Sequence, residues 1–260
     1  MKKVINKIYH NNIILLNHID KTVTFLRIQN YNKGLKYFTK TLDVLITTTQ
    51  NIFDNASYFN KDNVVIEEDY INFILNNLLN AQRNADYILL SDELEYRWVP
   101  FVTSLQEMII NKEGVSLFEN TYNNNLKLLI SKDKKLYKKL KDDEIYKINI
   151  DDYEVEFTSC GLTTLAKIQE GKRFYYHSNG NIMGEASLLA REWYSPDKSD
   201  YIVFGLGFGY HIMELAEIDE SITIHIYEND WNVLRLAFYY SDLGNLLSSD
   251  RILIHFDLRF

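Results

Sequence analysis

Three closely spaced glycines are the residues of this chain best suited to bind a ligand. The apolar run of residues 201–204 leads directly into Gly205, Gly207 and Gly209, and a helical pattern follows from Ile212. A strand, a glycine turn and a helix in this order present backbone N–H groups and the positive end of a helix, with no Cβ in the way. The sequence therefore predicts that this turn binds a polar or anionic edge of a ligand.

The spacing of the turn narrows the class of ligand. It is G-x-G-x-G and not G-x-G-x-x-G, because Tyr210 occupies the sixth position. This pattern favours the nucleoside-binding turn of S-adenosylmethionine-dependent methyltransferases over a nicotinamide-dinucleotide site. Methyltransferases usually carry an acidic residue two positions before the first glycine, where this chain has Val203. A methyltransferase-like protein that uses S-adenosylmethionine is an alternative for the function.

Two acidic residues end the predicted strands that follow. Glu228 comes after the apolar strand 221–227, about 20 positions beyond the first glycine, where a carboxylate accepts hydrogen bonds from ribose hydroxyls. Asp257 ends the strand 251–256, and in a methyltransferase-like site it would lie near the adenine. The alternative for Glu228 is that it caps the helix that begins at Trp231.

Four further polar residues lie beside the turn or at the end of an earlier predicted strand. Tyr210 and His211 stand at the start of the helix that follows the glycines. His211 would face a ligand, or else cap the helix in its neutral form. His177 and Ser178 end a predicted strand just before another helix, which suits contacts to a phosphate or a sugar. These four residues complete the predicted ligand site.

The sequence contains no motif of the commoner catalytic or metal sites. G-x-S-x-G, P-loop, H-E-x-x-H and Cys-x-x-Cys patterns are absent, which argues against the hydrolases, NTPases and zinc proteins that use them. His225 and His255 lie inside apolar strands, and we expect them to be core residues with satisfied hydrogen bonds. Glu228-Asn-Asp230 is the nearest approach to the Asp-x-Asp metal motif of nucleotide-sugar transferases. No catalytic residue and no metal site is predicted.

The elements that position these residues form an α/β arrangement. Strand, helix, strand, helix and strand over residues 201–257 make one mononucleotide-binding half of a Rossmann-like, doubly wound sheet, with three parallel strands. Alternating apolar and polar side chains over residues 145–177 predict a small antiparallel β element before it. Its strands are expected at residues 145–150, 153–158 and 172–177. Residues 181–193 return to a helical pattern.

Residues 1–113 are predicted to be helical throughout. Apolar residues recur at alternating gaps of three and four, as in Leu35, Phe38 and Leu42, and each such stripe must be buried against another element. An antiparallel bundle of about four helices, the last of which follows Pro100, is the simplest solution. An oligomer seam is the alternative. We expect a scaffold or a partner-docking module, since paired Glu-x-x-His motifs for a metal do not occur there.

The distribution of glycine divides the chain. Gly34 is the single glycine of the first 113 residues, and the chain changes character near Gly114. We therefore predict two domains, a helical bundle of residues 1–113 and a Rossmann-like α/β domain of residues 114–260. The second domain begins with a helix of residues 116–141, whose many lysines form a solvated face.

Composition and charge exclude several classes of protein. The 260 residues carry 28 Lys and Arg against 36 Asp and Glu, a net charge of −8, so the chain lacks the positive field that non-specific nucleic-acid binding requires. One cysteine permits no internal disulfide, and no apolar run reaches the roughly 18 residues of a membrane span. We expect a cytoplasmic protein that binds neither nucleic acid nor a membrane.

Several segments of the chain form a set of motifs. They are an N-x-x-x-L region within residues 123–140, His177-Ser178, Glu185-Ala186, the turn GLGFGYH of residues 205–211 and the strand end Glu228-Asn229. Taken together, they resemble the motility-associated-factor (Maf) flagellin glycosyltransferases. The similarity covers about residues 115–257, and residues 1–110 take no part in it.

The resemblance implies an amino-terminal, Rossmann-like portion of a transferase that attaches nonulosonic acid sugars to flagellin. Such a portion is expected to bind a nucleotide or a nucleotide-sugar, for example a CMP-sugar, at the glycine turn. The expected partner is a flagellin-like acceptor, with a second copy of the chain as the alternative. Ile182 stands where the family usually has proline, and we expect a looser start to that helix. The chain stops at Phe260, so the catalytic domain is expected to be missing; a non-catalytic partner-binding module remains an alternative.

Overall fold

The computed structural model describes residues 2–60, 66–142, 152–158 and 160–256. The chain divides into a helical unit, Met1–Gly114 with Ser159–Gly161, and a sheet unit, Val115–Thr158 with Leu162–Phe260. Amino-terminal helices, a small antiparallel sheet and a three-stranded parallel sheet confirm the predicted α/β class. None of the helices in the described segments is long and apolar enough to cross a membrane.

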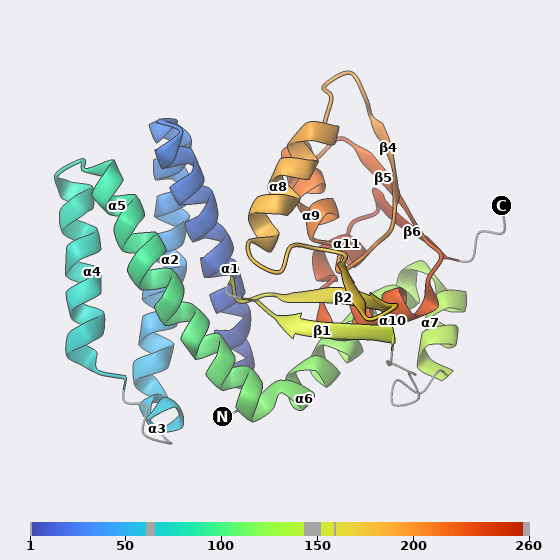
Figure 1. The fold of residues 1–260 in the computed structure, drawn as a ribbon, viewed down its shortest axis with the longest axis horizontal. Coiled ribbons are helices and arrows are strands. Elements are labelled where there is room, and N and C mark those ends of the chain that lie inside the picture. The colour runs from blue at the N-terminus through green and yellow to red at the C-terminus, as the bar shows by residue number, and fades with distance from the viewer. Residues whose placement is uncertain (1, 61–65, 143–151, 159, 257–260) are drawn as a thin grey trace. The chain divides into compact units, whose positions relative to one another are not determined.

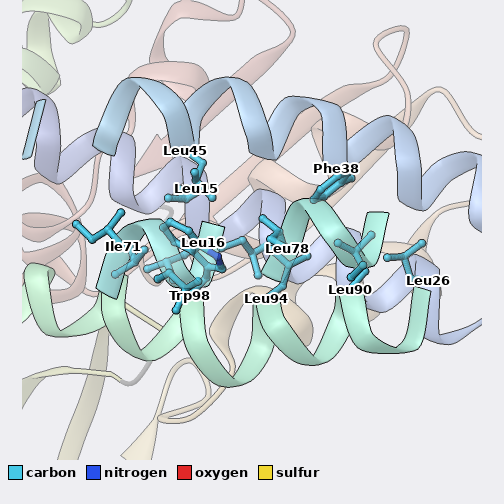
Figure 2. Packing of buried hydrophobic residues seen from close by; sticks show 14 residues of the cluster. Leu15, Leu16, Leu26, Phe38, Leu45, Ile71, Leu78, Leu90, Leu94 and Trp98 are labelled. Carbon is cyan, nitrogen blue, oxygen red and sulfur yellow. The ribbon is translucent and has the colours of Figure 1, made fainter. Parts of the chain in front are cut away.

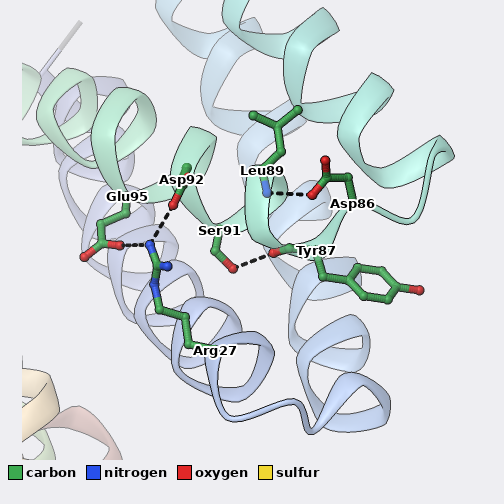
Figure 3. Close-up of polar contacts among 7 residues, drawn as sticks. All are labelled: Arg27, Asp86, Tyr87, Leu89, Ser91, Asp92 and Glu95. Carbon is green, nitrogen blue, oxygen red and sulfur yellow. Dashed lines mark hydrogen bonds and ion pairs between the residues drawn. The ribbon is translucent and has the colours of Figure 1, made fainter.

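Capping side chains set the starts of two helices of the helical unit, α2 (Tyr31–Asp54) and α5 (Tyr87–Glu93) (Figure 1). The Asn30 side chain accepts a hydrogen bond from the Lys33 N–H at 3.3 Å. The Asp86 side chain accepts one from the Leu89 N–H at 2.9 Å (Figure 3). Each cap satisfies a backbone donor that the first turn of a helix leaves free. The helices are α1 (Lys2–Arg27), α2 (Tyr31–Asp54), α3 (Ala56–Phe59), α4 (Glu68–Arg83), α5 (Tyr87–Glu93), the π-helix η1 (Leu94–Trp98) and the first part of α6 (Val99–Lys132).

An apolar cluster holds the helical unit together (Figure 2). Leu15 and Ile19 of α1, Phe38 of α2, Leu78 of α4 and Trp98 of η1 are at most 2% exposed. Burying one such side chain stabilises a fold by roughly 1.5–3 kcal/mol. The predicted apolar stripes thus meet one another within one chain, as the bundle prediction requires.

An unpredicted π turn precedes the helix around Pro100. Residues Leu94–Trp98 form a π turn, in which the Val99 N–H donates to the Leu94 carbonyl, and α6 follows at once. The helix predicted to follow Pro100 is therefore confirmed, whereas the π turn before it is not predicted. Proline lacks the N–H that an α-helix would use, and the π turn changes the bonding pattern just before it.

The exposed Arg27, the last residue of α1, bonds one residue of α5 and one residue of the π-helix η1 (Figure 3). The Arg27 guanidinium donates to Asp92 at 2.8 Å and to Glu95 at 2.6 Å. The three side chains are between 41% and 43% exposed. Solvent therefore screens these pairs, which contribute about 1 kcal/mol at most.

Helix α6 runs further than predicted. It continues through Gly114, and the short helix α7 (Lys134–Asp142) follows it. The expected start of a new helix at residue 116 is wrong, because one glycine inside a long helix costs only about 1 kcal/mol. The break comes at Asp133, whose carboxylate accepts from the N–H groups of Lys135 and Leu136, both at 2.9 Å, and so caps α7.

The sheet unit contains a three-stranded antiparallel sheet in the order β1-β2-β3. Its strands are β1 (Tyr153–Phe157), β2 (Thr163–Gln169) and β3 (Lys172–Tyr175). The outer two coincide with predicted strands, whereas the central strand is missing from the prediction. The first four residues of β2 are all buried, so it lacks the apolar–polar alternation of a half-buried strand. The strand expected at 145–150 lies outside the described residues.

The parallel sheet has the order β4-β5-β6 and confirms the predicted strands. Right-handed crossovers place the helices that connect such strands on the same face, so α9 and α10 cover one side of the sheet. Figure 1 shows α8 next to α9. The elements are α8 (Ile182–Trp193), β4 (Asp200–Phe204), α9 (Tyr210–Ile218), β5 (Thr223–Glu228), α10 (Trp231–Tyr240), α11 (Gly244–Ser248) and β6 (Ile252–Phe256).

The opposite side of the parallel sheet is an open face formed by Ile202, Phe204, Tyr227, His225 and His255. Ile202 and Phe204 are 64% and 71% exposed, although parallel sheets usually have both faces covered. The rings of Tyr227 and His255 stack with centroids 4.6 Å apart, and His225 hydrogen-bonds His255 at 3.1 Å. Both histidines are only half-buried, so the prediction that they belong to the core is wrong.

Candidate functional site

The predicted glycine turn connects β4 to α9. Gly205, Gly207 and Gly209 have φ values of 91°, 50° and 82°, in a region that residues with a Cβ rarely adopt. Gly209 is the N-cap of α9. Strand, turn and helix therefore follow one another as the sequence predicts, and each of the three positions favours glycine for its backbone alone.

The three glycines face different surroundings. A Cβ at Gly205 would meet nothing within 4 Å. A Cβ at Gly207 would lie 2.5 Å from Nε2 of His177, and one at Gly209 would lie 3.0 Å from the Leu246 side chain. Gly207 and Gly209 thus permit close packing inside the sheet unit. Of the three, Gly205 is the one with free space beside it.

The His177 imidazole holds the glycine turn in place through a hydrogen bond to Phe208, a contact that we call the His177 clamp. It is 4% exposed, and its Nε2 accepts a hydrogen bond from the Phe208 N–H at 2.7 Å. The accepting nitrogen carries no proton, so the neutral ring is protonated at Nδ1. Burial, with the neighbouring His211 adding to it, lowers the pKa of His177 to about 3. The Thr164 hydroxyl donates to the His177 carbonyl at 2.8 Å and ties the residue to β2.

His211 is kept uncharged by the same cause. Burial lowers its pKa to about 4, and a hydrogen bond with the Gly205 backbone acts in the opposite direction. Its ring centroid lies 5.6 Å from that of His177 and 5.6 Å from that of Trp193. Both histidines beside the turn are therefore neutral at pH 7, and neither adds positive charge there.

Glu228 ties the end of β5 to the glycine turn. It is 5% exposed, and one carboxylate oxygen accepts from the Leu206 N–H at 2.9 Å while the other accepts from the Asp230 N–H at 2.8 Å. The cap of α10 is Asp230, which accepts from the Asn232 and Val233 N–H groups. The alternative that Glu228 caps α10 is therefore wrong.

Tyr210 joins the turn to the antiparallel sheet. Its hydroxyl donates to the Thr163 carbonyl at 2.9 Å, and its ring meets that of His177 edge-on at 5.1 Å. Tyr210 is 6% exposed, so it is buried and holds the turn in position from inside the sheet unit. Asp257, which the sequence also predicts for the site, lies outside the described residues.

Ser178 is held at the start of α8. Its N–H donates to the Glu185 carboxylate at 2.7 Å. Asn181 caps α8 by accepting from the Gly184 N–H at 2.8 Å. This cap fixes the first turn without a proline, so the loosening expected at Ile182 is not found.

A polar cluster that sequence patterns do not reveal lies beside Glu228. The Tyr153 hydroxyl donates to Oδ2 of Asp230, and Nζ of Lys167 lies 3.7 Å from the same oxygen. Burial and then the negative charges of Asp230 and Glu228 raise the pKa of Tyr176. Tyr153, Lys167 and Tyr176 belong to the antiparallel sheet or follow it directly, so only the fold brings them to the end of β5. Asp230 is the member that the sequence marks, two positions after Glu228.

Asn125 of α6 supports the turn indirectly, because it bonds residues 238–243 and Ser241 bonds the turn. Its side-chain amide donates to the carbonyls of Phe238 and Ser241, both at 2.8 Å, and its oxygen accepts from the Leu243 N–H at 3.1 Å. The Ser241 hydroxyl in turn donates to the Phe208 carbonyl at 2.7 Å. An asparagine that is 1% exposed inside a helix needs such partners, and it gives the N-x-x-x-L region a structural role.

The structure gives no sign of a metal centre in the segments that it describes. There, no group of three His, Cys, Asp or Glu side chains is placed to hold a metal ion.

Two family models together match most of the chain. Residues 109–250, more than half of the 260, match the model described as glycosyltransferase Maf N-terminal domain. Residues 3–108 match a model described as a domain of unknown function (DUF8042). No curated protein and no solved structure matches the chain. The first match includes the glycine turn, the His177 clamp and Glu228.

Proposed function

Because the chain belongs to the family of the glycosyltransferase Maf N-terminal domain, we propose that its sheet unit binds a nucleotide or a nucleotide-sugar. The ligand lies at the carboxyl-terminal edge of β4 and β5, where open α/β sheets bind ligands. The observation that carries the proposal is the free space at Gly205 next to the turn that Glu228 holds.

Glu228 has capacity left for a ligand. A carboxylate offers about four lone-pair sites, and the two N–H groups of Leu206 and Asp230 occupy one on each oxygen. The remaining sites accept hydrogen bonds from ribose hydroxyls in this proposal. His177, Ser178, Tyr210 and His211 then act as positioning residues that hold the turn, since their polar atoms or rings contact neighbouring parts of the protein.

Isothermal titration calorimetry with CMP, UDP, their sugar conjugates and S-adenosylmethionine tests the proposal. The informative variant is Gly205→Ala, which fills the free space, and its matched control is Gly171→Ala, which also has a positive φ and nothing within 4 Å of a Cβ. We expect a nucleotide or nucleotide-sugar to bind the unmodified protein and Gly205→Ala to weaken it at least tenfold, with Gly171→Ala unchanged. No nucleotide binding, or equal weakening by both variants, would overturn the proposal.

A non-catalytic module is the second candidate. It is favoured by the fact that Glu228 and His177 already occupy the N–H groups of Leu206 and Phe208, which a phosphate would otherwise use. In that case none of the ligands produces a heat of binding in the calorimeter. If S-adenosylmethionine binds and nucleotides do not, a methyltransferase-like ligand replaces the nucleotide in the proposal.

A further inference from the structure

A cavity of about 250 Å³ lies in the helical unit, between the start of α4 and the first part of α6. Phe101, Leu105 and Met108 of α6 form its apolar wall, and Glu67 and Tyr70 line it at the start of α4. Glu67 and Tyr70 are exposed, so the cavity opens to solvent on their side. An apolar cavity of about 150 Å³ is already able to bind benzene. This cavity is therefore large enough for a small molecule or for one long side chain.

Two aromatic rings meet at the cavity. The centroids of the Tyr70 and Phe101 rings lie 6.2 Å apart, and the ring planes are inclined by 60°. Because the rings do not stack on each other, their faces are available to a third group. The face of an aromatic ring carries partial negative charge and attracts a cation within about 6 Å of its centroid. Several rings around one space are the arrangement in which proteins recognise quaternary ammonium groups.

Carboxylates lie at the open side of the cavity. Glu67 lines it, and Glu68 and Asp69 follow in the first turn of α4. The amino terminus of a helix is equivalent to about half a positive charge, which three carboxylates outweigh. Within the described segments, the Glu67 carboxylate makes no hydrogen bond or ion pair. The local charge therefore favours a cation over an anion.

Aromatic rings elsewhere in the helical unit already hold cations of the chain itself. The Arg97 guanidinium lies 5.4 Å from the centroid of the Phe73 ring. Lys112, one turn beyond Met108 on α6, donates to the Tyr58 carbonyl at 3.3 Å and lies 5.3 Å from the centroid of the Tyr58 ring. Among the residues that the structure describes, no lysine or arginine covers the two rings of the cavity. Those two rings are therefore free to receive a cation from outside.

We propose that this cavity binds an organic cation, an ammonium group carried on apolar carbon, with Glu67 as its counter-ion. Tyr70 and Phe101 present their ring faces to the ammonium group, and the apolar wall of α6 covers the carbon atoms. Such a group occurs in small molecules such as choline and in the side chain of lysine. The proposal concerns the helical unit alone and does not depend on nucleotide binding by the sheet unit.

NMR of the full chain with isotope-labelled methionine methyl groups tests the proposal. Met108 lines the cavity, whereas Met183 and Met213 belong to α8 and α9 of the sheet unit and serve as controls. The probe is choline, and its matched control is the neutral alcohol in which a carbon atom replaces the nitrogen of choline. We expect choline to shift the Met108 signal and not the two control signals. It should bind about fivefold more tightly than the alcohol, which has the same shape.

Two substitutions separate the charge from the rings. Glu67→Gln removes the counter-ion and should weaken choline binding about threefold. Its control is Glu68→Gln, at an exposed acid that does not line the cavity, which should leave the affinity nearly unchanged. Tyr70→Leu keeps an apolar side chain but removes the ring, and it should abolish the preference for choline over the alcohol. Its control is Tyr31→Leu, because Tyr31 is 40% exposed against 42% for Tyr70 and also contacts one other ring.

Three results would overturn the proposal. They are equal affinities for choline and the alcohol, a Met108 signal that choline does not shift, and equal weakening by Glu67→Gln and Glu68→Gln. A second titration, with an acetylated and amidated Gly-Lys-Gly tripeptide, identifies the source of the ammonium group. Tighter binding of the tripeptide supports a lysine side chain of a protein partner, and tighter binding of choline supports a small molecule.

Discussion

Lowering the pH from 7 to 5 should destabilise the sheet unit by about 4 kcal/mol. His177 and His211 have folded pKa values of about 3 and about 4, whereas histidine in an unfolded chain titrates near 6.5. Because both folded values are depressed, the stability that the neutral rings contribute is complete above pH 6.5. It is lost as the pH falls from there toward the folded values, by roughly 2 kcal/mol for each ring at pH 5.

Urea unfolding at pH 7, 6 and 5, combined with amide exchange at Phe208, measures this loss. The Phe208 N–H reports on the clamp directly, because it donates to His177. The matched variant is His177→Gln, whose side-chain oxygen is able to accept the same hydrogen bond but does not titrate. It should remove about half of the pH dependence. A variant with the full pH dependence would show that His177 is not the titrating group.

Replacing Gly207 by alanine should destabilise the sheet unit by about 4 kcal/mol, the largest effect that we expect from one substitution. The new Cβ would lie 2.5 Å from Nε2 of His177, and a ring that is 4% exposed has little room to withdraw. Overpacking of this kind costs about 1–3 kcal/mol. Displacing the ring would also leave the Phe208 N–H without its acceptor, at about 1–3 kcal/mol.

A double-mutant cycle separates the clash from the backbone strain. Gly171→Ala, at a φ of 72° and with nothing within 4 Å of the new Cβ, should cost only the strain of about 1–2 kcal/mol. Combining Gly207→Ala with His177→Ala should cost less than the sum of the two single changes, because the clash is removed. Additive costs, or equal costs at Gly207 and Gly171, would contradict the clamp.

The fold was predictable wherever a local pattern reports directly on burial. The three parallel strands alternate apolar and polar residues or run into glycines, and their positions follow from the sequence. Strand β2 has no such pattern, because its first four residues are buried on both faces. The π turn before Pro100 and the helix through Gly114 also escape prediction, since surrounding contacts outweigh the propensity of single residues.

The candidate site was predictable only in part. Glycine spacing locates the turn, but it does not reveal that His177 approaches Gly207 or that Glu228 bonds the Leu206 N–H. These contacts join residues that are far apart in the chain. Tyr176 and Lys167 carry no sequence signal for the same reason, because the antiparallel sheet alone brings them to Asp230.

The open face of the parallel sheet also governs how the protein behaves at high concentration. Ile202 and Phe204 expose apolar surface that neighbouring molecules can cover, and electrostatic repulsion from the net charge of −8 opposes this at neutral pH. As the pH falls toward the isoelectric point near 5.3, the net charge approaches zero and the repulsion is lost. Light scattering should therefore detect aggregates at mildly acidic pH, and Phe204→Lys should suppress them. Solubility and fold stability are thus lost in the same pH range, although for unrelated physical reasons.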